Sequence, residues 1–503
     1  MARKWGEWKR PIVYFCSLII VFFLLRIPKL TDLPIFTDEA IYIRWAQIGG
    51  SDAAWRFISM TDGKQPLFTW LVMASLRIFH DPLVTGRMVS VMAGLTSMVG
   101  LFLLGAELFK KKSVGLIATC LYVLSPFAFV YDRMALYDSL VATFFIWNLY
   151  LSVLLTRYMR LDFALILGLT LGVGMLNKTS AFLSLYLLPT TLFLFDWKSR
   201  YLAKRMALWI GLCIVSAILS QTVYGILRLS PFFYIISQKD TLFVYPFSEW
   251  VRHPLEFFYG NFHGLFNWLM TYVTWPIFTA AVISVACRKK YFFESVVCLM
   301  FFLAPFIALS LFGRILYPRF IFFMAMPLLL LAAYVMDNIM SVLKKKIVAW
   351  LVISLLCLPS VYLTARIFLD IKTAPLAKGD VGQLISDWPS GWGTKEVIMF
   401  LNRESQKGKV AVYTEGTFGL FPYALEIYLG ENKNVEIHGL WPLQREMPDD
   451  VRLSVQDKPT YFVSNFTQEK PLWPIELVAT YQKGNNPSVA MRLYKVMTSY
   501  ESR

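Results

Sequence analysis

Apolar stretches recur along the first three quarters of the chain, separated by short polar segments. Eleven of them approach the length needed to cross about 30 Å of hydrocarbon, at residues 12–27, 84–105, 113–131, 139–156, 162–177, 180–195, 206–227, 264–287, 292–311, 319–341 and 347–365. The pattern predicts an α-helical polytopic membrane protein, with about 11 transmembrane helices in a domain that covers residues 1–369.

Three other regions do not fit a span. Residues 31–83 contain the amphipathic stretch Pro66–His80, whose apolar face would lie on a membrane surface. Residues 228–263 are rich in aromatic side chains. Residues 370–503 combine a helical pattern at 394–406 with strand-like runs at 409–414, 460–465 and 491–496. These runs predict a second, soluble α/β domain over residues 370–503.

Composition supports a membrane protein and excludes several other classes. The 503 residues are 57% hydrophobic and 16% charged, which is not the composition of an ordinary soluble protein. Residues 370–503 hold 15 Lys and Arg against 16 Asp and Glu, so the net charge of +16 arises entirely from residues 1–369. Basic residues between apolar spans follow the positive-inside rule rather than forming a nucleic-acid surface.

The basic runs also predict orientation. With the N-terminus in the cytoplasm, the dense runs at 3–10, 110–112, 198–205, 288–290 and 344–346 all fall inside, and an odd number of spans places the tail outside. We interpret residues 1–25 as a retained first span, because no small-residue cleavage site follows the apolar core. The expected location is the plasma membrane of a prokaryote, with an extracytoplasmic C-terminal domain.

Sulfur and imidazole groups give no sign of a metal or redox site. All six cysteines lie in apolar stretches without metal-ligand spacing, so we expect neither a disulfide framework nor a metal. His253 and His263 have neither an H-E-x-x-H neighbour nor a third ligand at helical spacing. No cofactor is required, and a divalent cation is an option that the sequence does not support.

Charged residues gather at the predicted outer ends of the spans, although each is costly at membrane depth. The set comprises Asp38, Glu39, Lys64, Arg133, Asp138, Lys178, Arg314 and Arg319. Carboxylates mixed with cations suit a substrate that has a phosphate head and a lipid tail. A carboxylate can deprotonate an attacking hydroxyl while the cations neutralise a departing phosphate.

Each of these residues also has a structural alternative. Asp38 could cap the helix that begins near Glu39, since Asp is a favoured N-cap residue. Asp138 could pair with Arg133 and be purely structural. Single cations at span ends commonly extend to the membrane interface, which is the alternative for Lys64, Arg133, Lys178 and Arg319.

Several motifs in a fixed order resemble one family. The order is P-I-F-T-D-E-A-I-Y, then G-K-Q-P-L-F-T-W, then D-R-M-A-L-Y-D, L-N-K-T and finally Y-P-R-F. It is similar to the polyprenyl-phosphate-dependent membrane glycosyltransferases of the GT-C fold, in the branch of protein O-mannosyltransferases and the lipid A aminoarabinose transferase. The likeness covers residues 1 to about 340. In the lipid A branch a Glu precedes the lysine, whereas here Gly63 does, which argues against an aminoarabinose donor.

The resemblance implies roles for individual residues. Asp38 matches the catalytic base, Glu39 its partner in shaping the acceptor site, and Asp138 the second essential acid. Binding of the donor phosphate falls to Lys64, Arg133, Lys178 and Arg319. The implied function is that of an inverting hexosyl or pentosyl transferase. It would move a sugar from a polyprenyl-phosphate donor to an acceptor hydroxyl on a protein, glycolipid or polysaccharide, at the outer membrane face.

Two other classes remain open from the residues alone. A multispan transporter or lipid flippase would use Asp38, Asp138 and the lysines as coupling groups near the bilayer midplane. A noncatalytic receptor or assembly platform would only present the tail domain. We favour the transferase because the charges lie at span ends on one face. The expected partners are the lipid-linked sugar, the acceptor and membrane lipids, and no nucleic acid.

Overall fold

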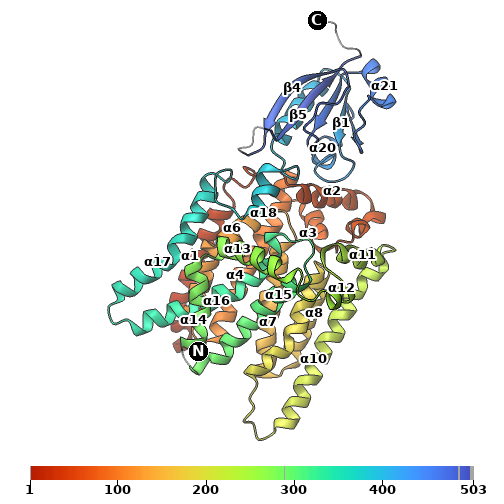
Figure 1. Ribbon diagram of the computed structural model, residues 1–503. Helices are drawn as coiled ribbons and strands as arrows, with labels where there is room; N and C mark the ends of the chain where they lie inside the picture. The colour runs from red at the N-terminus through yellow and green to blue at the C-terminus, as the bar shows by residue number, and fades with distance from the viewer. Residues whose placement is uncertain (1, 288, 485–487, 499–503) are drawn as a thin grey trace. The chain divides into compact units, whose positions relative to one another are not determined.

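The computed structural model describes residues 2–287, 289–484 and 488–498, without the side chains of residues 2–10 and 289. The chain forms two compact units (Figure 1). The bundle unit comprises Met1–Pro28, Arg56–Leu71 and Arg87–Ala377, and the sheet unit comprises Lys29–Trp55, Val72–Gly86 and Lys378–Arg503. The predicted basic residues 3–10, 288 and 289 lie outside the described side chains. A domain boundary at residue 369 stays a prediction.

Helices dominate the first 370 residues. The α-helices there are α1 Ala2–Arg26, α2 Thr37–Ser51, α3 Leu67–Ser75, α4 Pro82–Leu108, α5 Lys112–Leu124, α6 Pro126–Tyr131, α7 Asp138–Tyr158, α8 Leu161–Met175, α9 Phe182–Leu187, α10 Leu202–Tyr224, α11 Phe233–Phe243, α12 Phe247–Arg252, α13 Phe258–Val273, α14 Trp275–Cys287, α15 Phe292–Phe312, α16 Phe322–Val342 and α17 Lys346–Leu369. Tight helical turns are η1 Ala53–Trp55, η2 Ile58–Asp62, η3 Thr179–Ala181, η4 Leu188–Leu194, η5 Gly225–Leu229, η6 Lys289–Tyr291 and η7 Pro318–Ile321.

Every predicted span coincides with helical structure, but the count of eleven is not confirmed. Six helices in the described part of the chain are long and apolar enough to cross a membrane, or up to seven with one bent pair. The remaining predicted spans are shorter apolar helices: Pro11–Arg26, Lys112–Leu124, Leu161–Met175 and Thr179–Leu194. Breaks at helix-capping residues such as Ser125, whose hydroxyl caps α6, divide runs that look continuous in a hydropathy pattern.

The predicted span 264–287 is not one straight helix. Helices α13 and α14 meet at an angle of 102°. The break lies at Thr274, which has a φ of 67°. A β-branched residue rarely adopts a positive φ, so neighbouring structure must hold it there. The Thr274 hydroxyl lies 3.3 Å from that of Ser360 on α17.

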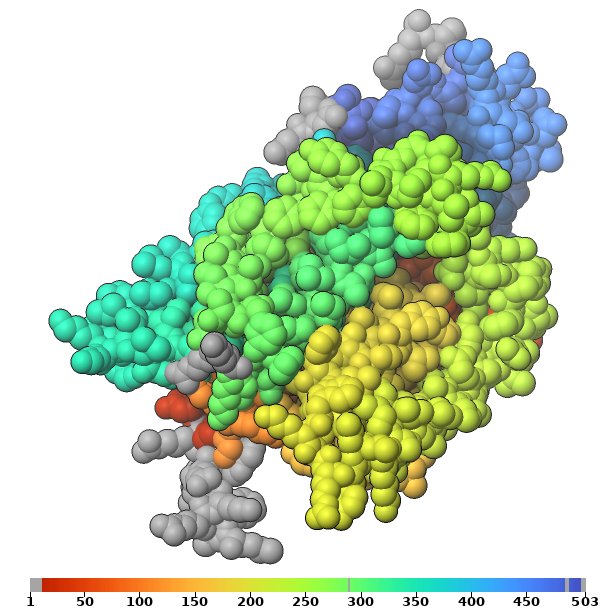
Figure 2. Space-filling model, turned by 60° about the horizontal axis from the view of Figure 1, so that its bottom comes forward, coloured from red at the N-terminus to blue at the C-terminus, as the bar shows by residue number. Residues whose placement is uncertain are grey.

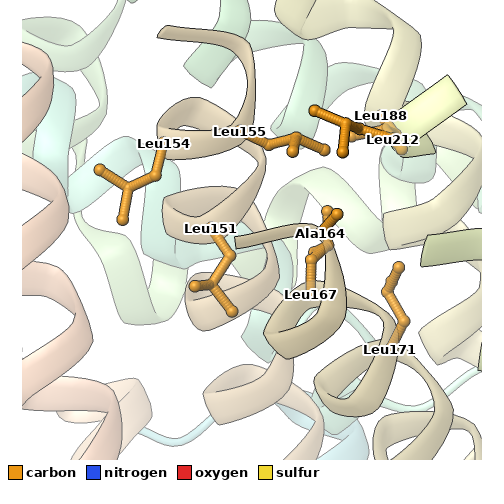
Figure 3. Close-up of a cluster of buried hydrophobic side chains, with 8 residues drawn as sticks. All are labelled: Leu151, Leu154, Leu155, Ala164, Leu167, Leu171, Leu188 and Leu212. Carbon is orange, nitrogen blue, oxygen red and sulfur yellow. The ribbon is translucent and has the colours of Figure 1, made fainter. Parts of the chain in front are cut away.

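Leucine packing holds four elements of the bundle unit together. Figure 3 shows the cluster that α7, α8, η4 and α10 form. It contains Leu151, Leu154, Leu155, Ala164, Leu167, Leu171, Leu188 and Leu212. The outer faces of α8 and α10 remain exposed, with apolar side chains such as Ile166 and Ile214 about half accessible. Figure 2 shows these two helices, in yellow and yellow-green, side by side on one face. A lipid environment suits such faces.

The sheet unit has a mixed five-stranded sheet in the order β2-β1-β3-β5-β4. Its strands are β1 Val410–Glu415, β2 Val435–Leu440, β3 Thr460–Ser464, β4 Ile475–Gln482 and β5 Ala490–Val496. Its helices besides α2 are α18 Lys378–Asp380, the π-helical turn η8 Val381–Ser386, α19 Thr394–Ser405, α20 Tyr423–Leu429 and α21 Asp449–Asp457. Strand β1 pairs in parallel with β2 and β3, whereas β5 is antiparallel to β3 and β4. The sheet confirms the expected mixture of helix and strand.

Candidate active site

Asp138 is a buried carboxylate that contacts two cations in the bundle unit. It is the first residue of α7 and only 5% exposed. Its Oδ1 accepts a hydrogen bond from the Lys178 Nζ at 2.8 Å, and its Oδ2 lies 3.9 Å from the Arg319 Nε. The alternative that Asp138 pairs with Arg133 therefore gives way to these two ion pairs.

Local structure explains why these side chains converge. Lys178 follows the end of α8, where the Asn177 amide donates to the Tyr137 carbonyl at 3.1 Å, next to Asp138. Arg319 sits in the turn η7, which starts at a proline. The Lys178 ammonium also lies 4.5 Å from the centre of the Phe320 ring, beside Arg319. Two cations share one carboxylate, so the group carries a net positive charge that suits an anion.

The segment that carries Lys64 is fastened to the loop that carries Lys178. The Leu67 amide donates to the Leu176 carbonyl at 3.0 Å, and the Gln65 amide donates to the Thr179 hydroxyl at 2.6 Å. Lys64 itself is partly exposed, with its Nζ 5.5 Å from the Phe243 ring. The structure thus brings together the segments of the predicted second acid, Asp138, and of three predicted donor-phosphate contacts, Lys64, Lys178 and Arg319.

Asp240 on α11 is a charged residue of this region that the sequence interpretation missed. Burial raises the pKa of its carboxyl group, against the opposing effects of a hydrogen bond with Thr179 and the charge of Lys64. A 2.5 Å ion pair between Lys239 and Asp62 fixes α11 to the turn before Lys64. No motif surrounds Asp240. Its only sequence context is the aromatic-rich segment 228–263, for which the sequence predicts no catalytic or binding role.

Arg133 lies in a different setting from the other donor-site candidates. Its guanidinium group is 4.6 Å from the centre of the Phe129 ring and donates to the Pro28 carbonyl at 2.9 Å. The preceding Asp132 is fully buried and pairs with Arg26 at 3.4 Å. The hydroxyl groups of Tyr122 and Ser139 also donate to Asp132. The two acids of the D-R-M-A-L-Y-D motif therefore differ, because the first is enclosed while the second meets two cations at a helix start.

The D-E pair lies in the sheet unit, at the start of α2. The helix begins at Thr37, so Asp38 is its second residue, and the expected alternative of an Asp38 N-cap is wrong. Glu39 satisfies the helix start instead, because its carboxylate accepts the Phe36 N–H at 2.9 Å. Glu39 is fully buried and Asp38 is half-buried. The N-cap position itself is Phe36.

The described residues contain no cluster of side chains that could hold a metal ion. Within residues 2–287, 289–484 and 488–498, no three His, Cys, Asp or Glu side chains come together to hold an ion. His253 lies 3.3 Å from Glu256, one turn along the chain. His263 lies near Asn267 on the same helix. That the protein requires no divalent cation stays a prediction.

Comparison with known proteins places this geometry in context. Residues 63–224 match the family model for dolichyl-phosphate-mannose-protein mannosyltransferases. Solved structures of ArnT from Cupriavidus metallidurans, in the apo state and bound to undecaprenyl phosphate, match 100% of the chain with a TM-score of 0.57 and 13% identity. The match covers 99% and 100% of those chains. The predicted resemblance is confirmed.

A second solved structure shares the fold. It is the archaeal oligosaccharyltransferase AglB from Archaeoglobus fulgidus, in complex with an inhibitory peptide and a dolichol-phosphate. The match has a TM-score of 0.53 and 12% identity, and it covers 92% of this chain and 70% of that one. No curated protein sequence matches the chain. At these identities the structural likenesses show the GT-C fold alone.

The family match and the charged group overlap in part. The matched residues 63–224 contain Lys64, Asp138 and Lys178. The D-E pair and Arg319 lie outside the matched range. Three of the seven sequence-predicted site residues thus lie both in the charged group and in the matched range, and their roles stay predictions. Arg133 also lies within the range but has the separate contacts described above.

Proposed function

We propose that the protein is an integral membrane inverting glycosyltransferase. It moves a hexosyl or pentosyl group from a polyprenyl-phosphate donor to an acceptor hydroxyl at the extracytoplasmic face. The observation that carries the proposal is the pairing of one buried carboxylate with two cations, Lys178 and Arg319, in a segment fastened to that of Lys64. The structural relatives that bind undecaprenyl phosphate or dolichol-phosphate support a lipid phosphate as its ligand.

Counter-charge is the main chemical need of this reaction. The bond from the sugar anomeric carbon to the phosphate oxygen breaks, and the polyprenyl phosphate leaves as a dianion. Lys64, Lys178 and Arg319 supply positive charge where negative charge develops, while Asp138 holds two of them in position. Arg133 is a further proposed phosphate contact. The isoprenoid chain would lie against exposed apolar helix faces.

Asp38 is the proposed base. It takes the proton of the acceptor hydroxyl as the oxygen forms its bond to the anomeric carbon from the opposite side, which inverts the configuration. Glu39 fixes the backbone at the start of α2. Through that contact it would shape the acceptor site indirectly. The acceptor is a hydroxyl of a protein, glycolipid or polysaccharide, and this chemistry requires no soluble cofactor.

Direct transfer tests the proposal. Purified protein is incubated with radiolabelled polyprenyl-phosphate hexoses and pentoses, with membrane extract as acceptor source, and with Lys178→Met and Lys204→Met as parallel samples. Lys204 is an exposed cation of the same unit outside the charged group. We expect label transfer with wild type and Lys204→Met but a strong loss with Lys178→Met. Binding of donors without any transfer would favour the transporter or flippase. The fold comparison does not favour that alternative.

A further inference from the structure

The start of α2 is held by the C-terminal part of the sheet unit. Both the backbone N–H and the hydroxyl group of Thr37 donate to the Pro389 carbonyl, at 3.1 and 2.9 Å. The two segments touch so closely that a Cβ at Gly391 would lie 2.0 Å from the Ile35 carbonyl oxygen. The residue immediately before Asp38 is therefore fixed by a segment about 350 positions later.

Further contacts fix the remainder of α2. Arg44 forms a 2.7 Å ion pair with Glu426, and the Gln47 amide donates to the Ile427 carbonyl at 3.0 Å. Both partners lie on α20, which runs beside α2 (Figure 1). These contacts restrain the position of the helix, while the Thr37–Pro389 contact restrains the end that carries Asp38.

The Pro389 segment is in turn gathered around one buried ammonium group. Lys483 is 0% exposed, directly after β4. Its Nζ lies 2.7 Å from the Ser390 carbonyl oxygen and 2.5 Å from the Asn465 Oδ1. The Asp387 and Trp388 carbonyl oxygens follow at 3.3 and 3.4 Å. The carbonyls on both sides of Pro389 thus turn toward Lys483, and the Pro389 carbonyl is the one that accepts from Thr37.

A second contact keeps Asn465 in place. Its side-chain amide donates to the Trp388 carbonyl at 2.9 Å, and its backbone N–H donates to the Glu415 carboxylate at 2.9 Å. Glu415 also accepts the backbone N–H groups of Phe466 and Thr467. The Lys483 ammonium is thus one member of a buried polar network in which each group is satisfied by several others.

We infer that Lys483 is a positioning residue for catalysis, which orients Asp38 through the chain Ser390, Pro389 and Thr37. This inference rests on the proposed role of Asp38 as the base. Because a base must lie within hydrogen-bond reach of the attacking hydroxyl, a small displacement of the start of α2 slows the transfer step. Donor binding by the bundle unit should be unaffected.

Protonation of Lys483 gives the inference a second signature. Burial lowers the pKa of Lys483 to about 7, against the opposing effects of its charged neighbours Asp387 and Glu415. A neutral amine has fewer N–H donors for the four surrounding oxygens than an ammonium has. The hydrogen bonds from Lys483 to these oxygens are therefore complete below about pH 7 and weaken as the pH rises through that value. The wild-type kcat should fall over the same range.

Lys483→Met tests the inference, with Lys407→Met as the matched control. Lys407 is 68% exposed in the same unit and pairs only with nearby Glu404 among the ion pairs of the described residues. We expect Lys483→Met to lower kcat about 10- to 100-fold, with donor KM within about twofold of wild type and no fall near pH 7. Lys407→Met should match wild type. A Lys483→Met enzyme that is folded and has wild-type kcat overturns the inference.

Two further variants separate positioning from other effects. In an Asp38→Asn background, Lys483→Met should lower kcat no further, because the group that it orients is gone. If the fold-decreases in kcat from Asp38→Asn and Lys483→Met multiply in the double variant, the inference is contradicted. If Lys483→Met does not fold, Thr37→Val decides, since it removes one of the two hydrogen bonds to Pro389, and unchanged kcat would be a negative result. Wild-type turnover by Asp38→Asn alone would instead refute the proposed base.

Discussion

Asp38 and Glu39 are adjacent, yet their surroundings differ. Glu39 is buried and its carboxylate accepts a hydrogen bond from the Phe36 N–H. Asp38 lies one position earlier and is half-buried. A sequence shows two acids at a helix start and cannot tell which one closes the first turn. The residue order predicts that both acids lie at a helix start. Which of the two contacts the backbone of the first turn depends on the exact first residue of the helix.

Asp38→Asn tests the proposed base. Asn has nearly the same size, and Asp38 does not cap α2, so folding and donor binding should stay close to wild type. Removal of a general base typically slows the reaction roughly 10²- to 10⁴-fold. Turnover and thermal stability are measured together on the purified enzyme. More than about a tenth of the wild-type turnover would move the base elsewhere.

Lys64 and Lys178 are expected to set donor affinity. A hydrogen bond to a charged group contributes about 1.5 to 3 kcal/mol, so Lys→Met at either position should weaken binding of a polyprenyl phosphate roughly 10- to 100-fold. Lys204→Met, which alters an exposed cation of the same unit, serves as the control. If all three variants bind polyprenyl phosphate with equal affinity, the two lysines only extend to the membrane interface.

Asp240 should oppose donor binding as it ionises. Its raised pKa means that the folded protein binds the proton more tightly than the unfolded chain, so ionisation costs stability as the pH rises above the ordinary carboxyl range. The ionised carboxylate also competes with the donor phosphate for Lys64. Asp240→Asn should therefore raise thermal stability and donor affinity at neutral pH, with little change at acidic pH. Calorimetric titration at both pH values measures this, and weaker binding by the variant would contradict it.

At the scale of elements, burial decides what the sequence reveals. The strand-like runs correctly predicted β1, β3 and β5, which are the inner strands and read as nearly continuous apolar runs. The missed strands β2 and β4 are the two edges of the sheet, where most side chains are partly exposed. Each edge strand pairs on one side only and exposes polar residues such as Glu436 and Glu476, so it has no continuous buried run like those of β1 and β3.

Gly63 illustrates a backbone requirement that becomes visible only with the neighbouring helix in place. It has a φ of 67°, and an added Cβ would lie 2.4 Å from the Lys239 Cβ on α11. Gly63→Ala should therefore displace α11 from the Lys64 segment and lower both stability and donor affinity. A strained positive φ costs about 1 kcal/mol or more before the contact is counted.

The control for this prediction is Gly211→Ala on α10. No atom lies within 4 Å of the position that its Cβ would take. Alanine favours a helix over glycine by about 1 kcal/mol, so this variant should be neutral or slightly more stable. Thermal unfolding and donor titration of the two variants provide the comparison. Wild-type behaviour of Gly63→Ala would show that α11 yields without cost.

At the scale of the whole chain, the basic runs at 110–112 and 344–346 lie at the opposite end of the bundle unit from the charged site. Helix α7 begins at Asp138 and spans 21 residues, about 30 Å at 1.5 Å per residue. In its last turn Arg157 pairs with Glu107 and Glu294, each at 3.0 Å. Lys111 pairs with Asp337 near the end of α16. These two predicted inner loops thus lie near the end of α7 that is far from the site.

This arrangement makes the orientation testable. Single cysteines replace Lys110, Lys345 or Arg452 in a variant that lacks the six native cysteines. All three positions are exposed in the structure, so a difference in labelling would report on the membrane rather than on burial. A membrane-impermeant thiol reagent added to intact cells should label only position 452, because Lys110 and Lys345 belong to basic loops predicted to be cytoplasmic. Permeabilised cells should label all three. Labelling of positions 110 and 345 but not of position 452 in intact cells would show that the orientation is the reverse of the predicted one, with the Asp138 group on the cytoplasmic side.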